Sequence, residues 1–262
     1  PVALPETLLM VVHKFEELQF FSKQDCKEII IDFVTYVPFR AIQIFQTSLS
    51  IISIPLLLFV IRRYIYGSTF HFNIKAIFIL YYSFATGHAT VNASMQLYQT
   101  VRSMLSDPCN AFPTRVEYET FNLCLASMTI GVVTIQLAIF CERAVATFCV
   151  HNYERHGILF AVVFSTMAVF FIFVIMLITY SHDDFDELTA SMLNTPSSAA
   201  PRINRMFIIL GSISVFVIIG MQILLRINKR THSRTPKSLS SRYQTLENMF
   251  ITRFATCLSS LQ

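Results

Sequence analysis

An acidic residue and an arginine stand side by side where a long apolar stretch ends, at Glu142 and Arg143. A carboxylate and a guanidinium this close can form a local ion pair that holds the arginine back. Once released, the arginine can reach the backbone of a docked partner, which makes the pair a candidate switch. The alternative is an ordinary structural ion pair, because an acid before an arginine is common at helix ends.

Four polar side chains interrupt another apolar stretch, at spacings of four, four and three residues. They are His88, Asn92, Gln96 and Gln99. On a helix this spacing places them along one face. Such a stripe either forms hydrogen bonds with neighbouring helices or faces a polar ligand or buried water. We therefore take His88, Asn92 and Gln96 as candidate ligand-facing residues and keep the helix–helix alternative open.

Residue patterns typical of catalysis are missing from the sequence. It has no nucleophile motif, phosphate-binding glycine loop, zinc spacing or paired carboxylates, and it contains only six glycines. The acidic run Asp183–Glu187 lacks the spaced ligands and the glycine of a calcium loop, so we interpret it as a solvated surface. We therefore expect no enzyme activity, no cofactor, no bound metal and no nucleic-acid partner.

Five long stretches without Asp, Glu, Lys or Arg must position these residues. Crossing about 30 Å of hydrocarbon takes about 20 nearly uncharged residues, and in lipid a helix satisfies its own backbone groups. The sequence therefore predicts an all-α membrane protein, a helical bundle like that of a seven-transmembrane receptor. The predicted spans are residues 41–61, 76–101, 120–141, 157–182 and 206–225, and residues 249–262 look like the start of a sixth.

The loops between these spans alternate in charge. The loop regions 62–75, 142–156 and 226–253 hold 12 of the chain's 20 Lys and Arg residues and few acids. Because Lys and Arg are enriched on the cytoplasmic side, these regions are predicted to be cytoplasmic. Residues 1–40 then form an extracellular N-terminal segment, and residues 41–262 form the membrane domain.

Two of the six cysteines, Cys26 and Cys109, fall in segments predicted to be extracellular. An oxidising setting allows a disulfide between them, which would tie the N-terminal segment to the third helix. Two free thiols are the alternative.

A basic stretch follows the fifth predicted span. It includes Arg226, Lys229, Arg230 and Arg242. Its partners should be acidic, and anionic lipid headgroups or an acidic cytoplasmic protein would both satisfy it.

Three segments of the chain resemble the nematode serpentine chemoreceptors of the Sra superfamily, most closely the Sre group. The first contains His71 and Asn73, the second joins Glu142-Arg143 to Asn152-Tyr153-Glu154, and the third precedes the sixth span. In that third segment the matching residues are Arg242, Tyr243, Gln244, Glu247 and Asn248.

This resemblance implies a seven-helix G-protein-coupled receptor of the plasma membrane, including sensory cilia. It would bind a small molecule from outside and signal to a heterotrimeric G protein. Glu142 and Arg143 stand where rhodopsin-like receptors keep an acid-Arg-Tyr motif, with Ala144 at the Tyr position. The expected coupling residues are Glu142, Arg143, Asn152, Tyr153, Glu154, Arg226, Lys229, Arg230 and Arg242.

The chain starts at Pro1 without a signal peptide, and its sixth apolar stretch is short. We therefore expect a C-terminally truncated receptor that lacks most of the sixth helix and all of the seventh. The alternative functions are a transporter or channel subunit and a membrane protein that does not signal.

Overall fold

The computed structural model describes residues 37–67, 71–105, 113–148, 159–180, 185, 192, 194–234, 246 and 249–256. Nearly all of these residues are helical, and no strand occurs among them. The helices are α3 (Val37–Val60) with the π-helix η2 (Ile61–Tyr66), α4 (Phe72–Leu105), α5 (Arg115–Phe148), α7 (Leu159–Thr179) and α8 (Ala200–Arg234). The predicted helical membrane fold is confirmed.

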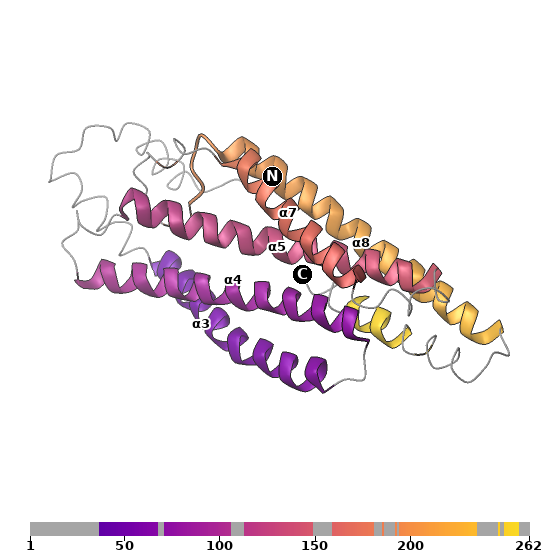
Figure 1. Cartoon of the computed structure of the whole chain (residues 1–262). Coiled ribbons are helices and arrows are strands. Elements are labelled where there is room, and N and C mark those ends of the chain that lie inside the picture. The colour runs from indigo at the N-terminus through magenta and orange to yellow at the C-terminus, as the bar shows by residue number, and fades with distance from the viewer. Residues whose placement is uncertain are drawn as a thin grey trace.

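α5 is the central helix of the bundle. It packs against α4 on one side and against α7 and α8 on the other, while α3 packs against α4 (Figure 1). We call the end of the bundle that holds Arg102 and Arg115 the predicted outer end, and the end that holds His71 and Phe148 the predicted inner end. These names follow the charge pattern of the sequence.

The starts of α4 and α5 follow from local side-chain chemistry. The backbone carbonyl of His71 accepts a hydrogen bond from the Lys75 N–H at 3.2 Å. The Nδ1 of the His71 side chain accepts one from the Asn73 N–H at 3.4 Å. At α5, the Glu117 carboxylate accepts from the Thr114 N–H at 2.8 Å, and Thr114 Oγ1 accepts from the Glu117 N–H at 3.4 Å. This Thr-x-x-Glu pattern is a capping box, which satisfies backbone donors that the first helical turn leaves unpaired.

Among the residues that the structure describes, four helical segments are long and apolar enough to cross a membrane. They are residues 40–66, 115–148, 159–179 and 200–230. α4 contains the span predicted at 76–101 and is long enough, but its polar side chains make it less apolar than the others. The prediction of five full spans therefore remains untested for α4, which is not among these four segments.

The helix bounds differ from the predicted spans because backbone hydrogen bonding continues past the apolar stretches. α5 and α8 extend beyond the predicted 120–141 and 206–225 at both ends. Past residue 60, at the end of the first predicted span, the chain continues as the π-helix η2 up to Tyr66. Pro55 lies inside α3, where its ring removes one backbone donor.

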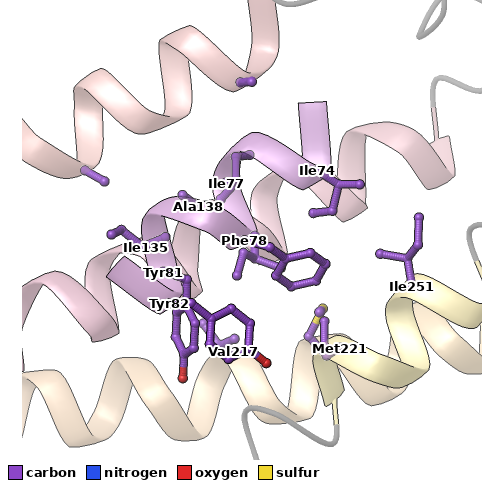
Figure 2. Close-up of a cluster of buried hydrophobic side chains, with 14 of the residues drawn as sticks. Ile74, Ile77, Phe78, Tyr81, Tyr82, Ile135, Ala138, Val217, Met221 and Ile251 are labelled. Carbon is purple, nitrogen blue, oxygen red and sulfur yellow. The ribbon is translucent and has the colours of Figure 1, made fainter. Parts of the chain in front are cut away.

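Two buried apolar clusters hold the bundle together. The larger joins α4, α5, α7, α8 and η2 and includes Ile251 and Ala255 of the helical segment 249–256 (Figure 2). The smaller joins Ile130 of α5 to Ile172 of α7 and to the first turns of α8. Large apolar side chains on α3, α7 and α8 remain exposed, which suits helices that contact lipid.

Candidate functional site

The Glu142–Arg143 pair is buried at the predicted inner end of α5. Arg143 donates to the Glu142 carboxylate through both Nε and an Nη, so the pair is bidentate. The Arg143 side chain is 1% exposed and the Glu142 side chain is fully buried. The local ion pair expected from the sequence is therefore present. A buried charge pair is costly to break by removing one partner, because the other charge is left uncompensated.

One turn further along α5, a hydrogen bond joins this region to α8. Asn228 Nδ2 donates to Thr147 Oγ1 at 3.2 Å, and Thr147 Oγ1 donates to the Arg143 carbonyl at 2.8 Å. Asn228 is buried, whereas Arg226, Lys229 and Arg230 around it are exposed. The geometry thus connects the arginine's own backbone to α8, and it leaves the basic side chains at the surface.

Asn228 was missed as a site residue in the sequence analysis. Its spacing from Met221 and Leu224 continues the apolar face of α8, at positions i, i+3 and i+7. A polar residue on that face is a signal of a buried partner.

Of the motif residues near α4, His71 and Asn73 have clear local roles. His71 caps the helix start, and Asn73 is fully buried one residue inside the helix. A further set of predicted site residues lies outside the described residues. They are Asn152, Tyr153, Glu154, Arg242, Tyr243, Gln244, Glu247, Asn248 and the pair Cys26 and Cys109, whose disulfide therefore remains a prediction.

The polar stripe of α4 faces α3. Asn92 Nδ2 donates to Ser50 Oγ at 2.8 Å, and Gln96 Nε2 donates to Gln46 Oε1 at 3.2 Å. Gln43 Nε2 donates to the Gln96 carbonyl at 3.5 Å. We call these contacts the α3–α4 ladder. For Asn92 and Gln96 the geometry thus supports the helix–helix alternative, while His88 lies half-buried on α4.

Residues of the loop between α7 and α8 cover the predicted outer end of α5. The Tyr118 hydroxyl donates to the Asn194 carbonyl at 2.7 Å, and Asn122 Nδ2 donates to the Met192 carbonyl at 2.8 Å. Phe185 is buried with its ring edge-on to Tyr118, at 5.5 Å between centroids. These contacts join distant parts of the chain, and no local sequence pattern predicts them.

A second polar contact joins α4 and α5 at this end. Arg102 forms an ion pair with Glu117, and the Tyr98 hydroxyl donates to the same carboxylate at 2.6 Å. Both charged side chains are partly exposed. Salt therefore screens this pair, and its contribution to stability is small.

The family model of the serpentine type seven-transmembrane G-protein-coupled receptor class ab chemoreceptors matches residues 23–262. The chain belongs to this serpentine receptor family. Serpentine receptor class beta-16 of Caenorhabditis elegans is 24% identical over 225 residues, which cover 85% of this chain and 66% of the relative. Class beta-17 of the same organism is 26% identical, over 86% of this chain and 63% of the relative.

Serpentine receptor class alpha-10 of C. elegans is 27% identical over 74% of this chain and 59% of its own length. The chain therefore spans less than two thirds of the length of each of these curated relatives. No solved structure matches the chain. The resemblance to nematode serpentine chemoreceptors is confirmed, while the match to the Sre group in particular remains a prediction.

Proposed function

We propose that this serpentine receptor binds a small molecule from the extracellular side and signals to a heterotrimeric G protein in the cytoplasm. The observation that carries the proposal is the buried Glu142–Arg143 pair at the inner end of the central helix. In this state Glu142 holds Arg143 away from the surface. A partner that binds the released arginine would favour a second state, and a ligand shifts the balance only through different affinities for the two states.

The connection to α8 supports this proposal. Movement of α8 relative to α5 would change the Asn228–Thr147 contact, whose acceptor is hydrogen-bonded to the Arg143 carbonyl. The exposed Arg226, Lys229 and Arg230 next to Asn228 would contact an acidic surface of the G protein or anionic lipid headgroups. Asn152, Tyr153, Glu154 and Arg242 are the further coupling residues that we propose.

We propose that the ligand binds among the outer halves of the helices, beneath Met192 and Asn194. The carbonyls of these two residues accept hydrogen bonds from Asn122 and Tyr118 of α5. In the proposed orientation the N-terminus is extracellular. The proposed location is the plasma membrane, including that of sensory cilia. We also propose that the full-length receptor has two complete helices after the fifth span. The relatives, whose lengths exceed the matched region, are in keeping with this.

The test expresses the full reading frame with a G-protein reporter and screens soluble and volatile compounds. Glu142→Gln removes the charge that holds Arg143, so we expect ligand-independent signalling several-fold above that of the unmodified receptor. Arg143→Ala should abolish the response at matched surface expression. Surface expression is measured for each variant, because breaking a buried pair costs about 3–5 kcal/mol.

Arg205→Ala serves as the matched control, since Arg205 is an exposed arginine on α8 far along the chain from Asn228. It should leave the response unchanged. A ligand response that survives Arg143→Ala would show that the coupling assignment is wrong.

A further inference from the structure

Two adjacent arginines, Arg62 and Arg63, lie on η2 where the first span ends. Both side chains are exposed. α3, η2 and α4 contain no Asp or Glu. Among the described residues of the predicted inner end, the one carboxylate is that of Glu142, and it is buried and binds Arg143. Within the part of the chain that the structure describes, Arg62 and Arg63 therefore have no carboxylate partner.

The π-helix keeps both arginines exposed although their neighbour Ile65 is fully buried. Ile65 lies in the larger apolar cluster with Ile74, where η2 packs against α4. In an α-helix, residues three apart lie on the same face, so Arg62 would turn toward the buried side that holds Ile65. The π-helix is closed by hydrogen bonds between residues five apart, and its wider turn separates the two positions. Such turns are frequent at functional sites.

Exposed aromatic side chains accompany the two arginines. Tyr64 is 54% exposed and Tyr66 is 66% exposed. The ring of Tyr64 contacts Phe59 of α3 edge-on, with 6.3 Å between the centroids, and Phe59 is also exposed. Tyrosines are enriched at the boundary between hydrocarbon and water, where the ring lies in lipid and the hydroxyl meets polar groups. η2 therefore lies at the level of the lipid headgroups.

We propose that η2 binds a phospholipid whose headgroup carries a phosphomonoester. The planar guanidinium of arginine presents paired N–H donors that match phosphate oxygens. A phosphomonoester carries a charge of about −1.5 to −2 at neutral pH, which the two positive charges of Arg62 and Arg63 balance. The hydroxyls of Tyr64 and Tyr66 can donate further hydrogen bonds to it.

This site differs from the basic stretch of α8, for which any acidic surface suffices. It lies on another element, and its arginines and tyrosines favour the phosphomonoester over other anionic groups. It involves neither the proposed chemical ligand nor the G protein, so its test stands apart from that of the receptor function.

Native mass spectrometry of the purified full-length receptor tests the site. Phosphatidic acid serves as the phosphomonoester lipid, and phosphatidylserine serves as an anionic lipid without a phosphomonoester. At equal concentrations, the unmodified receptor should bind several-fold more phosphatidic acid than phosphatidylserine. The double variant Arg62→Gln with Arg63→Gln should lose this preference. Equal binding of the two lipids by the unmodified receptor would show a general attraction to anionic lipid and would overturn the proposal.

Lys229→Gln with Arg230→Gln is the matched control, because it also removes two exposed positive charges at the predicted inner end. It should keep the preference for phosphatidic acid. All four side chains are exposed, so both double variants should melt at the temperature of the unmodified receptor. A preference that survives in the η2 variant, or that the control variant loses to the same extent, would contradict the proposed site.

Excess inorganic phosphate separates recognition of a lipid from recognition of free phosphate. It should leave most of the phosphatidic acid bound, because the acyl chains and the exposed aromatic rings hold the lipid in addition to its headgroup. Complete displacement by phosphate would mean that η2 binds free phosphate, and the assignment to a lipid would be wrong.

Discussion

Gly131 of α5 lets the ring of Phe84 on α4 come close to the helix backbone. A Cβ at position 131 would lie 2.1 Å from Phe84 Cδ1, far inside van der Waals contact. Phe84 is packed against both apolar clusters, so its ring cannot move without disturbing neighbours. Small residues at such positions allow membrane helices to approach each other.

We expect Gly131→Ala to destabilise the receptor by about 1–3 kcal/mol, the usual cost of overpacking a filled interior. The free energy of unfolding, followed by denaturant titration in detergent, measures the change. Gly211→Ala on α8 is the control, because a Cβ there meets nothing within 4 Å. Equal effects of the two substitutions would argue against the close α4–α5 contact.

Single residues were the least predictable level of this molecule. Glu142 and Arg143 were visible because two opposite charges adjoin at the end of an apolar stretch. Asn228 was not singled out, although the apolar face of α8 carries the signal. The contacts of Tyr118 and Asn122 with Asn194 and Met192 join residues about 70 positions apart, and no local pattern encodes such pairs.

Among the helices, α3 is held to the bundle in an unusual way. Most large apolar side chains of α3 are exposed, so apolar packing contributes little to holding this helix. The α3–α4 ladder supplies polar contacts instead, and Arg40 adds one by donating to Ser103 Oγ at 3.1 Å. Interhelical hydrogen bonds in membranes average about 0.6 kcal/mol each, so the ladder works through several weak contacts.

A double-mutant cycle with Ser50→Ala and Asn92→Ala should give a coupling free energy of about 0.5–1.5 kcal/mol, because the two side chains are bonded at 2.8 Å. Unfolding free energies of the four variants provide the measurement. A cycle of Ser50→Ala with Thr90→Val should show no coupling, since the exposed Thr90 donates to the Thr86 carbonyl of its own helix. Coupling near zero for the first pair would mean that the ladder contact is absent in the membrane.

Helices were easier to predict than their contacts. Long charge-free stretches must be helical in lipid, so each predicted span lies largely within one helix. The bounds differed where charged residues continue the helix, and the π-helix η2 has no residue signature that marks it. The face of α3 that contacts the α4 stripe was not predicted. Its signal is the spacing of Gln43, Gln46 and Ser50, three and four residues apart, which places them on one side of the helix.

For the molecule as a whole, the described helices form a bundle with a mostly apolar buried centre and an outer surface rich in exposed apolar side chains. α5 packs against α4, α7 and α8 (Figure 1). It holds the buried Glu142–Arg143 pair, whereas α3, α7 and α8 expose large apolar side chains. A protein arranged in this way needs a membrane around it. Its orientation in that membrane decides which end would meet the proposed ligand and which end would meet the proposed G protein.

We expect the N-terminus and the loop between α7 and α8 to be extracellular, because the basic loop regions lie at the opposite end. The test inserts a glycosylation acceptor cassette between Glu187 and Leu188 in one variant and between Lys237 and Ser238 in another. The first should migrate more slowly on a gel, with a shift that glycosidase removes, and the second should match the unmodified receptor. The unmodified receptor sets the baseline for the sequence Asn92-Ala93-Ser94, whose place within α4 argues against glycosylation. Glycosylation of the second variant alone would show that the orientation is the reverse of the predicted one. The Glu142–Arg143 pair would then lie on the wrong side of the membrane for a G protein.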